Sequence, residues 1–300
     1  MSHCEADDYT DVFSHFGARP TLPHSCYPWA PVFPADLDGR PVAVKRAAQR
    51  TGHAVARWCG SLVAQGVPVV APVAGPAWTG DRDWVVYPWI EGRAHNATMA
   101  DGDLVGRVLG ANSGNEGMAQ FPWPQYELDE PLEDLPALRE LFTRHAAADA
   151  SRLTERLAAL AKNFTRQTLP AVRDADLPMD FRVNNLVCTE SGPVLIDPDK
   201  GMRAPGILDL AIAVLLFHNE QDGAPPGLFT RAEWLVFRDA HLRHVEPTSD
   251  ELRAWPDVLD HVLWEEGAWA IAESTEWSVP RQRAFLLDLA GTANDAYPLP

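Results

Sequence analysis

The first part of the chain, residues 1–90, contains short apolar segments separated by proline, glycine and polar turns. Four of these segments have the length and valine content that favour β-strands, at residues 32–33, 40–45, 69–74 and 84–90. The first two flank Asp38-Gly39, a dipeptide typical of a tight hairpin turn. Helical spacing of apolar residues predicts one helix over residues 53–65, at Val55, Trp58, Leu62 and Val63. Residues 1–90 are therefore expected to form a small, mainly β lobe with one helix.

Beyond residue 90 the apolar residues recur mainly at helical spacing, which predicts a larger helical lobe over residues 91–300. Helices are expected at residues 98–111, 132–143, 146–168 and 207–218. Two further helix starts carry a capping box, in which a hydroxyl and a carboxylate satisfy free amides, at Thr230–Glu233 and Thr248–Glu251. One β-hairpin is embedded in this lobe, with strands at 186–188 and 194–196 around Ser191-Gly192. The pattern predicts an α+β fold of two lobes.

Three polar residues lie around the embedded hairpin. Asn185 precedes its first strand, Asp197 follows its second, and Asp180 lies on the loop that leads in. Because antiparallel pairing brings the outer ends of a hairpin together, the three side chains are expected to converge. Oxygen ligands of this kind suit Mg2+ and phosphate chemistry, and a carboxylate on a loop can accept or orient a hydroxyl proton. The alternative is that Asp and Asn are ordinary turn residues bonded to nearby backbone.

The bulk composition is that of a folded protein and excludes several classes of partner. The chain has 300 residues, 46% hydrophobic residues and a formal charge of −17, which argues against nucleic acid, since phosphate-binding faces need clustered Lys and Arg. The longest apolar run, Leu210–Phe217, is too short to span a bilayer, and no basic segment followed by an apolar run marks a secretory signal. The four cysteines show no paired spacing, so reduced thiols and a cytoplasmic location are expected.

The segment from residue 180 to 211 resembles the aminoglycoside phosphotransferase and choline kinase group of kinase-like enzymes. The matching pieces are D-x-x-x-x-N at Asp180–Asn185, I-D at Ile196-Asp197 and D-L-A at Asp209–Ala211. Lys45 on a valine-rich strand matches the position of that group's phosphate-contacting lysine, and residues 84–92 resemble its hinge strand. The resemblance extends in order from about residue 20 to residue 275.

The resemblance implies a bilobal protein-kinase-like fold that binds ATP, or another nucleoside triphosphate, together with Mg2+ in the cleft between the lobes. It assigns roles to individual residues of this chain: Asp180 as catalytic base or hydroxyl-orienting carboxylate, Asn185 and Asp197 as metal ligands, Lys45 on the α and β phosphates, the backbone from Tyr87 to Trp89 against the adenine, Asp199 as a supporting or metal-binding group, and Asp209 as an anchor for the loop. In the loop before the first strand, Ser25 and its neighbours are candidates to offer a hydroxyl and backbone amides to the nucleotide, and a plain surface loop is the alternative.

The sequence departs from the family pattern at three places. Pro178 stands where the family has a histidine two residues before the catalytic Asp. No Asp or Glu occurs between Asp38 and Asp81, so Lys45 lacks the usual glutamate partner on the next helix. Either a different segment holds Lys45, or its position is misread, or ATP alone organises it. The loop from Pro20 to Pro31 contains no glycine, so it is not a flexible phosphate flap.

The predicted function is ATP- and Mg-dependent O-phosphorylation of a small hydroxylated molecule. An antibiotic or related natural product is favoured as acceptor, which implies resistance or self-protection, with choline, ethanolamine or a homoserine-like metabolite as alternatives. The other functional class is a kinase-fold protein that binds a ligand with little or no phosphate transfer. Two sets of side chains could bind a cationic acceptor by ion pairing and stacking: Asp129, Glu130, Glu133 and Asp134 in one, and Glu265, Glu266, Glu273, Trp264, Trp269 and Trp277 in the other.

Overall fold

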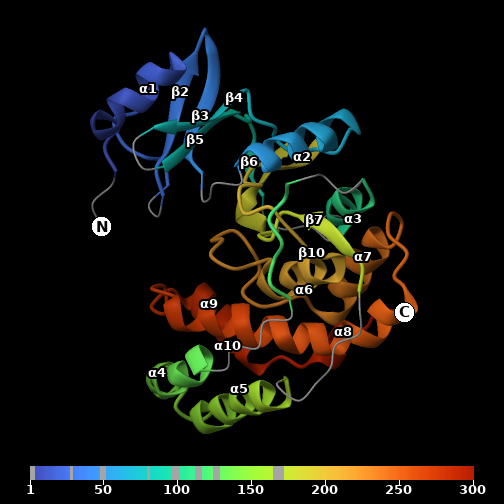
Figure 1. Ribbon diagram of the computed structural model, residues 1–300. Coiled ribbons are helices and arrows are strands. Elements are labelled where there is room, and N and C mark those ends of the chain that lie inside the picture. Colours follow the sequence, from blue (N-terminus) through green and yellow to red (C-terminus); the bar gives the residue numbers. More distant parts are fainter. Residues whose placement is uncertain are drawn as a thin grey trace.

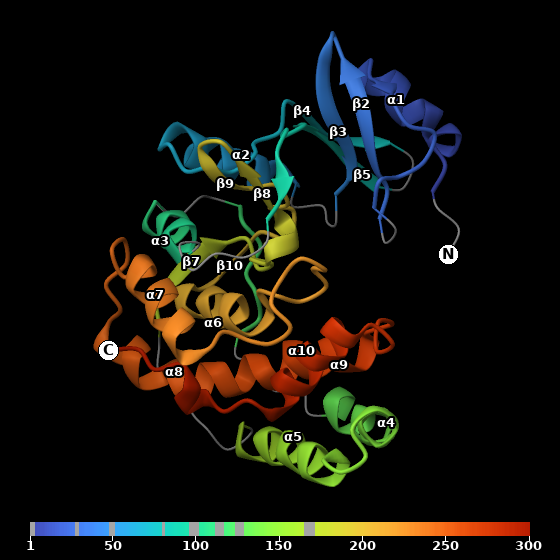
Figure 2. The same cartoon turned by 180° about the vertical axis from the view of Figure 1, so that it is seen from behind.

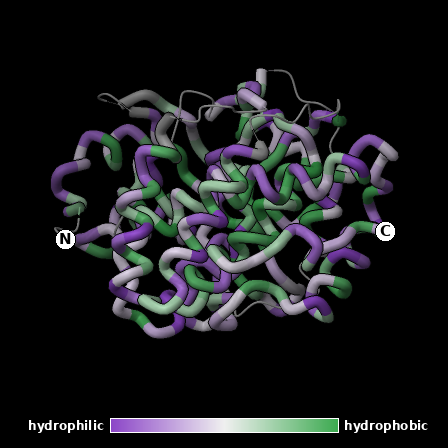
Figure 3. Tube along the Cα trace, turned by 90° about the horizontal axis from the view of Figure 1, so that it is seen from below, coloured by the Kyte–Doolittle hydropathy of each residue, from purple (hydrophilic) through white to green (hydrophobic). Residues whose placement is uncertain are grey.

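The computed structural model describes residues 4–27, 30–47, 52–79, 82–95, 102–111, 117–123, 129–164 and 172–300. In this part of the chain an N-terminal antiparallel sheet lies above a larger, mainly helical C-terminal part (Figure 1). Figure 3 shows apolar segments gathered toward the interior of the helical part and polar segments mostly around its outside. The predicted α+β, two-lobed architecture is confirmed, whereas a domain boundary at residue 90 stays a prediction.

The N-terminal sheet has five strands in the order β1-β2-β3-β5-β4. Their bounds are β1 Arg19–Pro20, β2 Val32–Leu37, β3 Arg40–Arg46, β4 Ala74–Thr79 and β5 Arg82–Pro88. Strands β2 and β3 turn at Asp38 and Gly39, whose φ angles are 53° and 80°, so the predicted hairpin is confirmed. A short helix, α1 (Thr10–Phe16), covers one face of the sheet, with Phe13 packed edge-on against Phe33.

The strand predicted over residues 69–74 is wrong, because β4 begins only at Ala74. The backbone of residues 68–70 bonds to the embedded hairpin and not to the sheet. Val70 donates its amide to the carbonyl of Leu195 at 2.9 Å, and Leu195 donates to Pro68 at 3.0 Å. Val73 already donates to Val86 on β5 at 2.8 Å, so this segment ties the hairpin to the N-terminal sheet.

Helix α2 (Gly52–Ala64) confirms the predicted helix, but its packing was not foreseen. Its buried residues include Val55, Trp58 and Leu62, which belong to the same apolar core as the C-terminal helices. The sheet has a separate core of its own around Phe33 and Val44. Val63 was predicted on the buried face, yet it is 46% exposed. Figure 2 shows α2 beside the embedded hairpin and away from the N-terminal helix α1.

The C-terminal part contains eight α-helices among the described residues. They are α3 Gly102–Gly110, α4 Asp129–His145, α5 Ala150–Phe164, α6 Gly206–Leu216, α7 Arg231–His241, α8 Ser249–Val262, α9 Ala268–Glu273 and α10 Pro280–Gly291. The helices predicted over 132–143 and 207–218 are confirmed, and α3 agrees with the helix predicted over 98–111. The helix predicted over 146–168 begins only at Ala150, because residues 146–149 form the turn after α4. Both capping boxes are present at the starts of α7 and α8.

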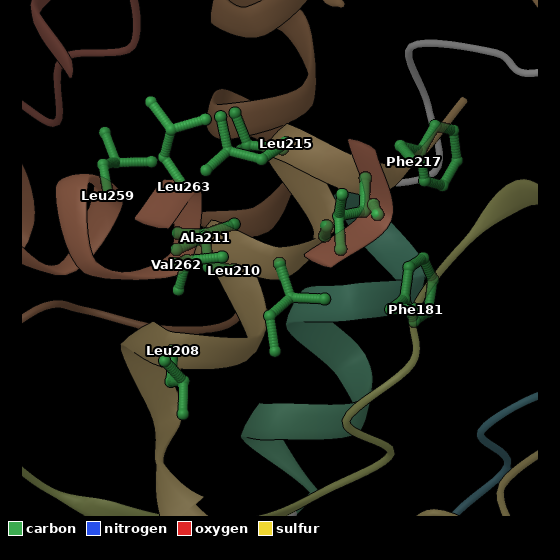
Figure 4. Packing of buried hydrophobic residues seen from close by; sticks show 14 of the residues in the cluster. Phe181, Leu208, Leu210, Ala211, Leu215, Phe217, Leu259, Val262 and Leu263 are labelled. Atoms are coloured by element: carbon green, nitrogen blue, oxygen red, sulfur yellow. The ribbon is translucent and has the colours of Figure 1, made fainter. Parts of the chain in front are cut away.

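Helix α6 is the centre of this part. Every residue from Ile207 to Leu216 is buried, including the carboxyl group of Asp209. Figure 4 shows Leu210, Ala211 and Leu215 beside Leu259, Val262 and Leu263 near the end of α8, with Phe181 and Phe217 stacked at one side. A helix that is apolar all round needs neighbours on every face, which explains its central position.

Two small sheets lie between α6 and the N-terminal part. One pairs β7 (Asp174–Leu177) with β10 (Met202–Pro205), and the other has the order β6-β8-β9. Strands β8 (Leu186–Thr189) and β9 (Gly192–Leu195) form the embedded hairpin, which is therefore confirmed, and β6 (Arg93–Ala94) pairs with β8. Among the described residues, no helix has both the length and the apolar character that crossing a membrane requires.

Asp209 joins α6 to the loop that carries Asp180. Its side chain is 1% exposed, and the backbone amide of Met179 faces its carboxyl group. Burial raises the pKa of Asp209 to about 7, against the opposing effect of that amide. The folded protein therefore holds a proton on Asp209 at pH values where the unfolded chain has released it.

This proton predicts a defined pH dependence of stability. The stabilising contribution is complete below the ordinary carboxyl pKa and is lost as pH rises toward about 7. Relative to Asp209→Asn, we expect the free energy of unfolding of the wild type to fall by up to about 4 kcal/mol between pH 4 and pH 7. Urea unfolding at several pH values measures this difference. Asp239→Asn, at an exposed carboxylate, is the control, and a wild-type to Asp209→Asn difference that is flat with pH contradicts the assignment.

Candidate functional site

The loop from residue 178 to 185 connects β7 to the embedded hairpin and is fixed by its own hydrogen bonds. Met179 has a φ angle of 57°, an unusual value for a residue other than glycine, and it turns the chain into Asp180. The carbonyl of Asp180 accepts from the Arg182 amide at 2.9 Å and from the Asn185 side chain at 2.8 Å. The amide of Val183 donates to Phe217 at the end of α6, also at 2.9 Å. The backbone around Asp180 is thus held rigidly from two sides.

The Asp180 carboxylate lies between two cations. Arg182 donates through Nε to Oδ1, and the Nζ of Lys200 lies 3.0 Å from Oδ2. Burial would raise the pKa of Asp180, but Arg182 and Lys200 outweigh it and hold the pKa below its usual range. Asp180 is therefore ionised at neutral pH and can accept a proton or a hydroxyl hydrogen bond.

The two ends of the hairpin meet as predicted. The amide of Ile196 donates to the carbonyl of Asn185 at 2.9 Å, so Asn185 and Asp197 leave the hairpin at the same end. The side-chain amide of Asn185 is used on Asp180, which leaves its carbonyl oxygen Oδ1 outside that bond. Residues 180, 185 and 197 thus belong to one small region of the backbone.

Lys45 on β3 reaches this region from the N-terminal sheet. Its Nζ is paired with Oδ1 of Asp197 and lies 3.0 Å from Oδ2 of Asp199. The hydroxyl of Tyr87 donates to the other oxygen of Asp199, whose side chain is only 5% exposed. Helix α2 has no glutamate to pair with Lys45, and the segment after the embedded hairpin holds Lys45 instead. Asp199 is that partner, a stronger role than the sequence indicated.

The ion pairs around Lys45 leave an excess of negative charge. Burial acts to lower the pKa of Lys45, but Asp197 and Asp199 outweigh it and keep the lysine charged. Burial raises the pKa of Asp199, and the neighbouring Asp197 adds to this effect. Two carboxylates share one ammonium group, so an additional cation would be stabilised here. Among the described residues, no three His, Cys, Asp or Glu side chains are grouped as a ready-made metal site.

The hinge residues lie next to this cluster. Tyr87 is buried with Ala47, Val70 and Val85 in a small apolar group between the sheet and the hairpin. Trp89 is 39% exposed, and its amide already donates to Pro41 at 3.1 Å. Since Pro88 has no amide hydrogen and the amide of Trp89 is engaged, neither of these two residues offers a free backbone donor to a base. A hollow of about 450 Å³ lies there, bounded by Trp89, Ile90 and Leu186 among others.

Ser25 lies inside its own loop, 2% exposed. Its hydroxyl accepts from the amides of Tyr27 and Val32 at 3.1 and 3.0 Å and lies 2.8 Å from the carbonyl of Tyr27. The amides of Ser25 and Cys26 are also engaged, on Cys4 and Val32. These bonds give Ser25 a role in shaping a loop without glycine, and its contact with phosphate stays a prediction.

The sequence did not indicate Arg182 and Lys200, the two cations beside Asp180. It indicated Glu266 only as one of several candidate acceptor-binding residues. Arg182 and Lys200 lie two and three residues after Asp180 and Asp197, a spacing that could have indicated them. Glu266, on the π-helical turn Leu263–Gly267, is mostly buried. Burial raises its pKa, against the effect of Arg182 and Lys200. Glu266 therefore faces the same region as Asp180.

The other candidate acceptor-binding residues are paired, buried or exposed in other ways, and none of those described below is linked to Asp180 as Glu266 is. Glu265 is paired with His261 at 2.8 Å, Trp264 and Trp277 are buried, and Trp269 is 56% exposed. Glu133 and Asp134 on α4 are exposed. Of the described residues in the two acidic sets, Glu266 is the one whose carboxyl group interacts electrostatically with Asp180.

Comparison with known proteins assigns the chain to a family. The profile of the phosphotransferase enzyme family matches residues 35–255, well over half of the chain. A search of the curated proteins found no significant match.

Solved structures share the fold at low sequence identity. The amicoumacin kinase hAmiN, in complex with AMP-PNP, Ca2+ and Ami, has a TM-score of 0.64 at 14% identity, over 97% of this chain and 94% of that chain. Spectinomycin phosphotransferase, in complex with ADP and spectinomycin, has a TM-score of 0.61 at 14% identity, over 97% and 98%. A microcompartment-associated aminopropanol kinase has a TM-score of 0.58 at 14% identity, over 95% of each chain. The chain is therefore a small-molecule kinase that belongs to the phosphotransferase enzyme family and has its kinase-like fold.

Proposed function

We propose that the protein transfers the γ-phosphate of ATP, with Mg2+, to a hydroxyl group of a small hydroxylated molecule. The observation that carries this proposal is the ionised, buried Asp180 at the same hairpin end as Lys45, Asp197 and Asp199. Phosphoryl transfer depends mainly on positioning and charge stabilisation, and this arrangement supplies both.

The nucleotide side of the site is proposed to consist of Lys45, Asn185 and Asp197. Carboxylate and amide oxygens are the donors that Mg2+ prefers, and the excess negative charge beside Lys45 fits a divalent cation. When bound, the metal supplies neutralisation of the phosphate charge. Lys45 would exchange one of its carboxylate partners for phosphate oxygens, while Asp199 keeps its bond from Tyr87. The adenine is proposed to lie along the hinge from Tyr87 to Trp89, beside the hollow at residue 90.

Asp180 is proposed to receive the acceptor hydroxyl. Because its pKa is lowered, Asp180 is a weak base, which favours a role in orienting the acceptor hydroxyl. It would accept the hydroxyl proton only after the bond to phosphorus has begun to form, as a loose transition state requires. Lys200 is half exposed, and its Nζ lies 3.0 Å from Asp180. Its ammonium group is therefore proposed to turn from Asp180 and bind the transferred phosphate. Arg182 is almost fully buried and keeps the carboxylate in place.

The acceptor is proposed to be a hydroxylated natural product, such as an antibiotic, that carries a positive charge. Glu266 places a carboxyl group beside the catalytic region, and Glu220 acts on Arg182 from another side. Fold neighbours are named for amicoumacin, spectinomycin and aminopropanol, which supports small molecules of this kind. Resistance or self-protection in the cytoplasm would follow from an antibiotic acceptor. Choline, ethanolamine and homoserine-like molecules remain in the acceptor panel.

Replacing Asp180 with Asn tests the proposed chemistry. We expect kcat to fall by about 10²- to 10⁴-fold, the usual contribution of a positioned acid or base, while Mg-ATP binding survives. Coupled measurement of ADP release with a panel of hydroxylated amines gives kcat, and Asp222→Asn at an exposed position is the control. Normal turnover in Asp180→Asn refutes the role of Asp180. Nucleotide binding by the wild type without transfer to any acceptor favours the ligand-binding alternative.

The position of Lys45 predicts that its replacement lowers both the affinity for Mg-ATP and the free energy of unfolding. Lys45→Met should abolish stabilisation of the protein by Mg-ATP in a thermal-shift assay. It should also lower the free energy of unfolding by about 3 kcal/mol, because Asp199 is left buried without a counter-ion. Adding Asp199→Asn should recover part of this loss. Arg19→Met removes a cation from the exposed pair with Asp36 and should change little. Equal effects of Lys45→Met and Arg19→Met contradict the central role of Lys45.

The charge of the acceptor is tested at Glu266. Glu266→Gln should lower kcat/KM for cationic acceptors by about 10-fold or more, the contribution of a charged hydrogen bond, and should affect neutral acceptors much less. Glu155→Gln, at an exposed position on α5, is the matched control. Steady-state kinetics with paired amine and neutral acceptors measure the effect. An equal loss for both acceptor classes shows that Glu266 acts on the protein and not on the acceptor charge.

A further inference from the structure

A cavity of about 220 Å³ lies between α3, α6, α7 and the start of α8. It shares no residue with the site around Asp180 and Lys45. Its apolar lining includes Leu109, Ala175, Ile207, Leu210, Leu242 and Val245. Ile207 and Leu210 are three residues apart, so they lie on one face of α6, whereas Asp209 points toward the loop at Met179.

One polar ring lines this cavity without a protein partner. His241, at the end of α7, is 4% exposed, and its Nδ1 has no hydrogen-bond partner among the described residues. Burial lowers the pKa of His241 to about 4, His244 acts in the same direction, and Glu251 opposes them. The ring is therefore neutral at pH 7, with one nitrogen as donor and the other as acceptor. His241 belongs to the lining of the cavity, so a polar group of a bound molecule gains by pairing with this ring from the cavity side.

Arg173 and Glu251, at the edge of the cavity, neutralise each other. Arg173 donates to both carboxylate oxygens of Glu251, at 3.1 and 2.8 Å, and Glu251 also accepts from the Thr248 amide at 2.7 Å. Gln120 contacts the exposed Asp174 at 3.3 Å. The wall thus offers no unpaired cation to an anionic ligand, and the apolar lining disfavours any ion.

We propose that this cavity is a second small-molecule site, which takes a compact, uncharged, mainly apolar molecule with one hydroxyl group directed at His241. Apolar cavities of about 150 Å³ bind benzene, so a singly substituted aromatic ring fits a cavity of this size. A hydroxyl both donates and accepts, so it can pair with His241 in either tautomer. The proposal stands independently of phosphate transfer, because its residues and its test lie outside the site around Asp180.

Phenol is the probe, with toluene as the matched probe that lacks the hydroxyl and benzoate as the charged one. Methyl NMR of the full-length protein should show saturable shifts at Ile207, Leu210 and Val245 on phenol titration. Phenol should bind about 3- to 10-fold more tightly than toluene, the value of one hydrogen bond, and benzoate should bind least. His241→Phe keeps a ring of similar size and should abolish the preference for phenol. Val245→Trp, on a loop beside the cavity, should fill it and abolish binding of both.

The wild-type comparison of phenol with toluene needs no substitution, so it decides the proposal even if a variant folds poorly. No saturable shift at these methyl groups, or equal affinity for phenol and toluene, overturns it. Tighter binding of benzoate than of phenol overturns the assignment of an uncharged ligand. Unchanged phenol binding in folded Val245→Trp places the ligand elsewhere and also overturns it.

Discussion

The ion pairs of Lys45 are the contact on which the two parts of the molecule depend. One ammonium group on β3 is shared by Asp197 and Asp199, which follow the embedded hairpin. Tyr87 on β5, in the same sheet as Lys45, donates its hydroxyl to Asp199. In a kinase-like fold the strand lysine normally pairs with a glutamate of the next helix, and this sequence has no acidic residue there. The cluster therefore replaces that contact between the two parts, and it does so with residues that are also proposed to bind the nucleotide and the metal.

The rigidity of the site comes from helix α6 and the short loop in front of it. The helix is buried along its whole length, and Phe217 at its end receives the amide of Val183. Met179 adopts a left-handed conformation that turns Asp180 toward Arg182 and Lys200. Where the family carries a histidine, this chain has Pro178, and the side-chain amide of Asn185 and the backbone amide of Arg182 hold the loop by donating to the carbonyl of Asp180. The absence of that histidine is thus compatible with an ordered catalytic loop.

Features with a local cause could be predicted from the sequence. The Asp38-Gly39 turn, the capping boxes and the embedded hairpin each depend on a few neighbouring residues, and all three are present. Residues 69–74 and Val63 were misjudged because their environment is set by distant segments, the embedded hairpin in one case and the C-terminal core in the other. The partner of Lys45 depends on a contact across more than 150 residues. No spacing rule within one helix or strand could identify it.

The packing of α2 has a consequence for how the cleft can open. Because its buried face belongs to the core of the C-terminal helices, α2 is expected to move with them as one body. The moving body is then the sheet β1–β5 with α1, which has a core of its own. Bending between the two bodies would take place after β5, and the ion pairs of Lys45 with Asp197 and Asp199 connect the two bodies. Moving the sheet away from the helices would require the ion pairs of Lys45 with Asp197 and Asp199 to break, so the same contact that holds the two bodies together also resists their separation.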